Sequence, residues 1–521
     1  KRRRRKRGTM VDPAVRVMIN EEVCEGCGDC GVQSNCVSLV PVETPLGTKR
    51  AVDQSSCNKD YSCVNGFCPS FVTLQGAKIR KEAAKDLVLP EMAEPTLPAI
   101  SDTYNVVITG VGGTGVVTLG AVLAQAAQIE GKGAGLMEMA GLAQKGGAVH
   151  IHLRLAKKPA DISAIRVAIG EADCVIGGDL VVSAGAKTLG LMTSGRTGAV
   201  VNSHEIVTGE FTRNRDFRLP GEDLKLALSA RLGNGVQFFD ASILARKALG
   251  DSIYSNMLVL GAAWQRGLVP LSLEAIREAI KLNGAAVAAN IKAFDLGRWA
   301  VAAPKEVAAF LHEEEVVQVV DPIAFRRKHL AAYGSGTIAR FDALLARTPE
   351  ALRVAVAKGY AHVLAVKDEY EVARLHLTSL EKAREEFEGD LRPTFHLAPP
   401  IFSGGGERPK KRAFGPWVVP VFRVLAAMRP LRGGLFDPFR WSGERREQMA
   451  HLAQFEADMA RLLPRVTPET EEILRELAEL PLSVRGFGPV RAKAQAQAET
   501  RRAALLAAFD AGGTPERLAA Q

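Results

Sequence analysis

The sequence predicts an α/β protein made of a small cysteine-rich module, a doubly wound domain with a mainly parallel sheet, and a mostly α-helical C-terminal region. Seven of the eight cysteines fall between Cys24 and Cys68. Strand-like runs alternate with helix-period segments from Tyr104, and apolar residues recur every three or four positions beyond Pro304. We expect a basic connector over 1–16, the cysteine module over 17–82, a linker over 83–103, the parallel-sheet domain over 104–303 and the helical domain over 304–521.

The composition, 47% hydrophobic and 24% charged, is typical of globular proteins. No apolar run reaches the roughly 18 to 20 residues of a membrane span, and no apolar segment follows the basic N-terminus as in a secretory signal. These features predict a cytoplasmic protein without membrane attachment, in which disulfides are not expected. The stretch KRRRRKR, residues 1–7, supplies seven of the nine net positive charges. It lacks aromatic residues for base stacking, so we interpret it as a solvated connector rather than a nucleic-acid-binding patch.

The cysteine module has the spacing of an iron–sulfur site. Cys24, Cys27 and Cys30 form C-x2-C-x2-C, and Cys68 is followed by Pro69. Ferredoxin-type proteins hold a [4Fe–4S] cube with such a triple and a remote Cys-Pro. A zinc ribbon would instead need two C-x2-C pairs. We therefore assign Cys24, Cys27, Cys30 and Cys68 to one [4Fe–4S] cluster in a ferredoxin-like module.

Three further cysteines of the module leave a question open. Cys36, Cys57 and Cys63 are candidate ligands of a second cluster, but a fourth cysteine is missing and their spacing differs from that of a two-cluster ferredoxin. Either a second cluster takes a non-cysteine ligand or these residues are structural thiols. The eighth cysteine, Cys174, lies in an apolar run and is predicted to be a buried strand residue.

A glycine motif of the form G-x-G-x-x-G follows the first strand of the second domain and precedes a helix. That context is typical of a Rossmann-like domain, whose helix N-terminus binds a diphosphate or another anion. Glu138 lies near the expected place of a ribose-binding acid. Alternatively, the glycines only permit close helix-to-strand packing. The candidate cofactor-binding residues are Gly110, Gly112, Gly113, Thr114 and Gly115, with Lys145, Gly146 and Gly147 of a second glycine pair.

Several stretches resemble the single-chain bacterial indolepyruvate:ferredoxin oxidoreductases, of the 2-oxoacid:ferredoxin oxidoreductase family. They are the cysteine segment INEEVCEGCGDCGVQSNC, the stretches GVGGTG and QKGGAVHIHLRL, and the phrases VKDEYEVARL, FDPFRW and RGFGPV. The resemblance covers nearly the whole chain from about Val17, and 104–303 is similar to the family's gamma domain. It implies oxidative decarboxylation of an arylpyruvate with CoA to an acyl-CoA and CO2, using thiamine diphosphate and Mg²⁺. Electrons would pass singly through [4Fe–4S] clusters to ferredoxin.

The thiamine site of that family shows a G-D-G stretch, which this sequence lacks, because GGD at 177–179 is followed by Leu180. The resemblance therefore implies an electron-transferring half that assembles with a thiamine-binding half or subunit into an oligomer. Its other partners would be ferredoxin, the arylpyruvate and CoA. The sequence identifies no catalytic acid or base. Two other functions stay open: an NAD(P)-linked iron–sulfur oxidoreductase that uses the glycine motif, and an iron–sulfur protein that binds nucleic acid through residues 1–7.

Overall fold

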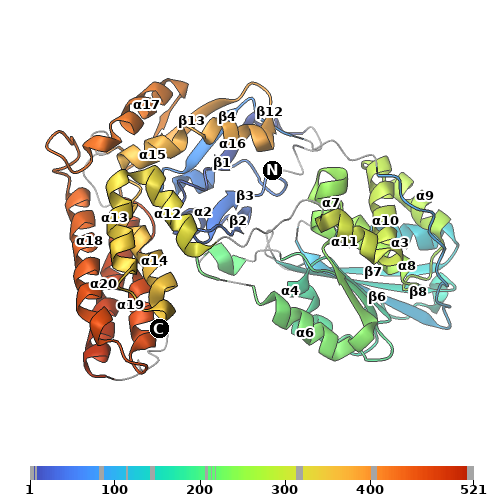
Figure 1. The fold of residues 1–521 in the computed structure, drawn as a ribbon. Coiled ribbons are helices and arrows are strands. Elements are labelled where there is room, and N and C mark those ends of the chain that lie inside the picture. Colours follow the sequence, from blue (N-terminus) through green and yellow to red (C-terminus); the bar gives the residue numbers. More distant parts are fainter. Residues whose placement is uncertain are drawn as a thin grey trace. The chain divides into compact units, whose positions relative to one another are not determined.

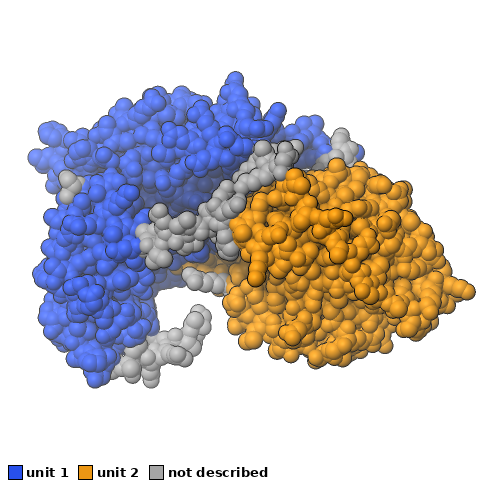
Figure 2. All heavy atoms as spheres, turned by 45° about the vertical axis from the view of Figure 1, so that its right-hand side comes forward, with its two compact units in different colours: residues 1–80, 318–521 blue, residues 81–317 orange. Residues whose placement is uncertain are grey.

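The computed structural model of the protein describes residues 5, 9–80, 87–112, 115–140, 147–205, 209–212, 214–217, 219–312, 321–399 and 408–512. The chain forms two compact units, unit 1 from residues 1–80 and 318–521 and unit 2 from residues 81–317 (Figure 2). This division differs from the predicted boundaries. The C-terminal region folds with the cysteine module, and helix α11 (Pro304–His312) belongs to unit 2 because Val307 and Phe310 pack into its core.

Unit 2 is built on a six-stranded sheet of order β11-β10-β9-β6-β8-β7 (Figure 1). Strands β6, β9, β10 and β11 are parallel, whereas β8 runs antiparallel to both β6 and β7. The predicted α/β fold with a mainly parallel sheet is confirmed. Strand β8, next to the edge strand β7, is the one strand of this sheet that runs in the opposite direction. The strands are β6 (Thr103–Val111), β7 (Gly133–Ala140), β8 (Ala148–Ala156), β9 (Cys174–Gly177), β10 (Gly198–Asn202) and β11 (Val236–Phe239).

Helices cover both faces of this sheet, as a doubly wound fold requires. Strand β6 sends Val106 and Ile108 into the core on one face and Val107 into the core on the other. The first core is shared with α3 (Val116–Ile129), α7 (Ala241–Leu249), α8 (Ser255–Gln265), α9 (Leu273–Asn283) and α10 (Val287–Ala302). The second is shared with α4 (Leu180–Ser183), α5 (Ala186–Leu189) and α6 (Gly221–Leu232). Residues 87–102 have no helix or strand, yet Leu89 and Leu97 pack on the first core.

We expect His152 to make the stability of unit 2 depend on pH. It is 2% exposed on β8, and its Nδ1 accepts a hydrogen bond of 2.9 Å from the Val167 N–H. Burial lowers the pKa of His152 to about 4. The folded unit therefore binds fewer protons than the unfolded chain, whose histidine pKa is about 6.5, so this contribution is complete above about pH 6.5 and is lost as the pH falls toward 4. Hydrogen exchange of the β6 and β8 amides should lose protection over that range, and less so in His152→Asn; equal losses in both proteins would contradict the assignment.

Unit 1 joins the two ends of the chain in one antiparallel sheet of order β1-β4-β13-β14. Strands β1 (Val15–Ile19) and β4 (Phe71–Gln75) come from the cysteine module, whereas β13 (Arg392–Leu397) and β14 (Arg412–Phe414) come from the C-terminal region. Strand β1 thus begins inside the predicted connector. Two smaller pairs complete the unit: β2 (Leu39–Val42) with β3 (Lys49–Val52), and β5 (Lys78–Ile79) with β12 (Phe387–Glu388).

Helices form the rest of unit 1. One core holds α12 (Pro322–Tyr333), α13 (Ser335–Leu345), α14 (Glu350–Leu364), α18 (Gly443–Leu462), α19 (Glu471–Glu479) and α20 (Gly488–Asp510), several of which lie side by side in Figure 1. A second core packs α15 (Glu369–His376), α16 (Ser379–Glu386) and α17 (Val419–Ala427) against the sheet. Within the described part of the chain, no helix combines the length and the apolar character needed to cross a bilayer.

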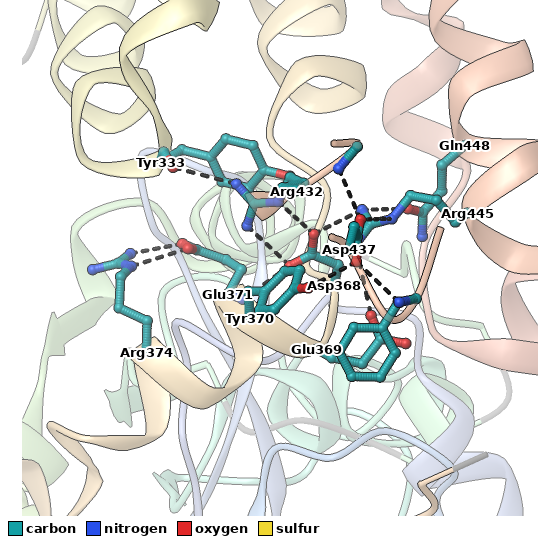
Figure 3. Close-up of polar contacts among 12 residues, drawn as sticks. Tyr333, Asp368, Glu369, Tyr370, Glu371, Arg374, Arg432, Asp437, Arg445 and Gln448 are labelled. Atoms are coloured by element: carbon teal, nitrogen blue, oxygen red, sulfur yellow. Dashed lines mark hydrogen bonds and ion pairs between the residues drawn. The ribbon is translucent and has the colours of Figure 1, made fainter. Parts of the chain in front are cut away.

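A buried ion network fixes the segment 429–445 against α15 (Figure 3). Asp368, whose side chain is 1% exposed, accepts hydrogen bonds from Arg432 at 2.6 Å and from Arg445 at 2.7 Å. Asp437 accepts a hydrogen bond of 2.7 Å from the Tyr370 hydroxyl. These residues lie in or beside the phrases VKDEYEVARL and FDPFRW. The two phrases therefore hold distant segments of unit 1 together.

Candidate functional site

Four cysteines of unit 1, Cys24, Cys27, Cys30 and Cys68, form the first cysteine group. Cys24 and Cys27 precede helix α2 (Asp29–Ser34), which carries Cys30. The returning chain passes directly over this helix, since a Cβ on Gly66 would lie 2.8 Å from the Cys30 Cβ. Cys68 follows at once, and the four thiols lie close enough for their charges to act on one another. The structure thus brings together the four residues that the spacing assigned to one cluster.

The backbone around Cys24 directs an N–H group toward the sulfur of that residue. Gly26 and Gly28 adopt φ angles of 67° and 77°, which residues with a Cβ rarely do. A Cβ on Gly26 would also lie 2.1 Å from the Thr48 carbonyl oxygen. The turn directs the Gly26 N–H to the Cys24 Sγ at 3.3 Å. Such N–H donors stabilise the negative sulfur of an iron–sulfur ligand.

Burial raises the pKa of the thiols of Cys27, Cys30 and Cys68, and the neighbouring cysteines raise it further. Binding iron must therefore displace protons from these thiols. Among the described residues, no three His, Cys, Asp or Glu side chains converge as the ligands of a single metal ion.

Positive charge surrounds the first cysteine group. Lys49 is 6% exposed, and Lys411 lies over the Phe71 ring with its Nζ 4.8 Å from the ring centroid. Within the described residues, neither ammonium forms a close ion pair with a carboxylate, although the charge of Glu25 acts on Lys49 and that of Asp29 acts on Lys411. A buried ammonium without a close ion-pair partner is costly, and a cluster with a net negative charge would supply one. A third cation, Lys367, pairs with Glu25 at 2.6 Å; although burial opposes it, this contact and the Lys49 charge hold the pKa of Glu25 at about 2.

The second cysteine group consists of Cys36, Cys57 and Cys63. The β2–β3 hairpin brings Cys36 and Cys57 to the same end, where the Asp53 N–H donates to the Ser38 carbonyl at 2.8 Å. Cys63 lies on the short 3-10 helix Ser62–Asn65. This helix contacts α2, and Cys36 follows α2 in the sequence after one intervening residue. Burial raises the pKa of Cys63 to about 12, and the charges of Cys36 and Cys57 add to the shift. The three thiols are thus neighbours, without a fourth cysteine.

The loops of the second cysteine group carry backbone strain. Four non-glycine residues in the described part of the chain have a positive φ, and three of them, Asn35, Lys59 and Tyr61, lie within two residues of these cysteines. Such conformations cost free energy and gather at functional sites. The Lys59 N–H also points to the Cys57 Sγ at 3.4 Å, as the Gly26 N–H does to Cys24.

The glycine motif of unit 2 lies at the carboxyl end of β6. The Gly112 N–H donates to the Gly147 carbonyl at 2.8 Å, so the two predicted glycine stretches are in contact. Gly115, with a φ of 84°, is the N-cap of α3, and its carbonyl accepts a hydrogen bond of 3.2 Å from the Asn256 side chain. Gly110 lies near the carboxyl end of β6, and Gly178 lies beside it. The predicted residues Gly113, Thr114, Lys145 and Gly146 lie outside the described residues.

Glu138 does not lie beside this motif. It is exposed on β7, and β8 separates that strand from β6. Two strand spacings amount to about 10 Å, whereas a ribose-binding acid follows a strand adjacent to the glycine-bearing one. Glu138 is therefore not placed to act as the ribose-binding acid of a dinucleotide site at the glycine motif.

Comparisons with known proteins agree with this architecture. Residues 105–300 match the family described as pyruvate ferredoxin/flavodoxin oxidoreductase, and residues 318–504 match a family of unknown function, DUF6537. Indolepyruvate oxidoreductase subunit IorB of Pyrococcus horikoshii is 32% identical over 208 residues, which cover 39% of this chain and 97% of that protein. The chain belongs to the IorB family.

An IorB protein from Thermococcus kodakarensis is 29% identical over 39% of this chain and 97% of its own length. The crystal structure of the gamma subunit of a keto/oxoacid ferredoxin oxidoreductase from Geobacter sulfurreducens is 22% identical, with a TM-score of 0.27, covering 38% of this chain and 98% of that one. The match to IorB proteins thus leaves more than half of this chain unmatched.

Sequence reasoning missed several polar residues of unit 2 at the carboxyl ends of β10 and β11. Asn202 donates to the Gly178 carbonyl at 3.2 Å and accepts from the Ala241 N–H at 3.0 Å. His204 Nδ1 lies 3.1 Å from Asp240 Oδ2, and although burial opposes it, this partner holds the pKa of Asp240 below its usual value. Their place in the sequence could have identified them, because they follow apolar strands closely. Open α/β sheets bind ligands at the carboxyl ends of their strands.

Proposed function

We propose that this IorB-family chain is the electron-transferring half of an indolepyruvate, or arylpyruvate, ferredoxin oxidoreductase. Cys24, Cys27, Cys30 and Cys68 would hold a [4Fe–4S] cluster, which supplies one-electron transfer when bound. One observation carries the proposal: four thiols from two distant segments lie close together, beside ammonium groups that form no close ion pair with a carboxylate of the described residues.

The chain's own residues would hold and screen this site. The Gly26 N–H donates to the Cys24 sulfur, and the Ser70 hydroxyl lies 2.9 Å from the Cys68 sulfur. Buried apolar residues such as Phe71 keep water away from the thiols. Oxidative decarboxylation, with thiamine diphosphate, Mg²⁺ and CoA, is assigned to a thiamine-binding half or subunit, and ferredoxin would accept the electrons.

The glycine motif is the candidate contact for an anion of that reaction, such as a diphosphate of CoA or thiamine. The positive φ of Gly115 opens the N-terminus of α3, and backbone N–H groups at a helix N-terminus favour anions. Gly110, Gly112, Gly113, Thr114 and Gly115, with Lys145, Gly146 and Gly147, remain the proposed residues.

For the second cysteine group we propose a second iron–sulfur cluster with three cysteine ligands. Its support is the proximity of Cys36, Cys57 and Cys63, the strained loops that carry them, and the Lys59 N–H directed at the Cys57 sulfur. Iron and acid-labile sulfide per chain, measured after anaerobic reconstitution, decide this point. An iron content that fits one cube and does not fall in Cys63→Ala would contradict it.

Reconstitution with a thiamine-binding half tests the proposed reaction. With indolepyruvate, CoA and thiamine diphosphate present, we expect reduction of added ferredoxin, and none when the chain is omitted. Absence of turnover with every arylpyruvate tried, despite a filled cluster, would remove the substrate assignment.

Two further experiments test the other functions. Bleaching of the cluster absorbance by NADH or NADPH would favour a nucleotide-linked oxidoreductase. Salt-sensitive nucleic-acid binding that is lost on deleting residues 1–7 would favour a nucleic-acid-associated protein.

A further inference from the structure

The C-terminal region reaches the loops that carry the first cysteine group. Lys367, just before α15, donates from its Nζ to the Cys24 carbonyl at 3.0 Å. His376, at the end of α15, lies with its Nε2 3.0 Å from the Pro69 carbonyl oxygen, next to Cys68. Both residues lie within 318–504, the part that matches a family of unknown function. Lys367 and the last residue of α15 thus contact the two segments that supply thiols, one segment each.

The phrase RGFGPV packs on the same group from another direction. A Cβ on Gly486 would lie 3.3 Å from the Cys27 Cβ, and one on Gly488 would lie 2.6 Å from the Phe67 ring. Phe487, between them, packs against the apolar core that surrounds the cysteines. Gly486 has a φ of 108°, so the tight approach and the backbone conformation both require glycine. This phrase therefore forms a close cover over Cys27.

Lys411 completes the enclosure from the segment that precedes β14. Its Nζ donates to the Cys68 carbonyl at 3.2 Å and faces the ring of Phe71. No carboxylate pairs with it among the residues that the structure describes. Every electron that arrives at the first cysteine group would add negative charge beside this ammonium, and a fixed positive charge at short range favours the more negative state.

We propose that the C-terminal region is the housing of the first cluster, and that Lys411 is a positioning residue whose charge raises the cluster's reduction potential. The inference rests on the proposed function, because it needs iron at the first cysteine group. The region would thereby have two tasks. It limits the access of water and oxidants to Cys27, which is partly exposed, and it stabilises the reduced state so that an electron can be accepted before it passes to ferredoxin.

The potential of the full-length, iron-loaded protein tests the role of Lys411. Lys411→Gln keeps a donor for the Cys68 carbonyl and removes the charge, so we expect a more negative midpoint potential by spectroelectrochemistry with the iron content unchanged. Lys411→Arg should retain the wild-type potential. Lys358→Met is the matched control, because this lysine of the same region pairs with Glu479 at 3.1 Å rather than contacting the cysteine loops. Equal potentials in Lys411→Gln and wild type would overturn the proposal.

A second pair of variants tests the housing itself. Gly486→Ala should lose iron, or bleach faster in air, because its Cβ would lie 2.8 Å from the Val490 side chain and 3.3 Å from the Cys27 Cβ, so the phrase must move away from Cys27. Gly443→Ala, where a Cβ meets no atom within 4 Å, should behave as wild type. The same air stability in both variants would overturn the housing role. Wild-type protein that binds no iron at the first cysteine group would instead refute the proposed function, so the two failures are distinguishable.

Discussion

Replacing Asp368 by alanine should lower the free energy of unfolding of unit 1 by about 3 to 5 kcal/mol. The carboxylate is 1% exposed and is shared by Arg432 and Arg445, whose side chains are 16% and 8% exposed. Without it, two guanidinium groups remain inside the protein with their closest counter-charge removed (Figure 3). The variant also loses the N-cap of α15, because Asp368 Oδ1 accepts from the Glu371 N–H at 2.9 Å.

An exposed ion pair of the same region supplies the control for Asp368→Ala. Asp390 pairs with Arg392 at 3.0 Å, and the two side chains are 77% and 69% exposed. Asp390→Ala should therefore change stability by no more than about 1 kcal/mol. Urea unfolding, with hydrogen exchange of α15 and α18 to assign the transition to unit 1, measures both variants. Similar midpoints would mean that the buried network contributes little.

Cys68→Ala should abolish the first cluster and, with it, electron delivery to ferredoxin. Cys68 is 6% exposed and is the only thiol of its group that comes from beyond residue 30. Cys63→Ala, at 5% exposure, removes an equally buried thiol from the second cysteine group and should leave the first cluster spectroscopically intact. Iron analysis and the electron paramagnetic resonance signal of the reduced protein measure the difference.

Cys174→Ala separates a lost ligand from a lost core thiol. Cys174 is 0% exposed on β9 in unit 2, as the sequence predicted for a buried strand residue. This variant should retain all the iron of the wild type. If Cys68→Ala retained the same iron content as Cys174→Ala, the assignment of Cys68 as a ligand would be wrong.

Local spacing predicted much of the protein. The fold class followed from strand and helix periodicity. The residues of the first cysteine group could be named because the spacing C-x2-C-x2-C with a remote Cys-Pro is typical of a [4Fe–4S] site. Strand direction could not be predicted in the same way. Alternating apolar residues look alike in both orientations, so β8 was expected in a mainly parallel sheet and lies antiparallel to β6.

Long-range contacts were beyond such reasoning. Nothing in the residues around Lys411 or Gly486 indicates that they meet Cys68 and Cys27, because these contacts join segments that lie far apart in the sequence. The division into units was missed for the same reason. The short strands β13 and β14 carry no strong period-2 pattern and are defined by the strand beside them.

The pairing of both chain ends within unit 1 sets an order of events during synthesis. Cys68 and Lys411 are 343 residues apart in sequence. At the usual pace of translation, roughly 20 to 70 seconds separate their emergence from the ribosome. During that interval the cysteine segment is complete while the strands and helices that enclose it do not yet exist. Unit 2, whose residues are contiguous, can fold first, and the cysteines stay accessible until residues 318–521 have been made and have folded around them.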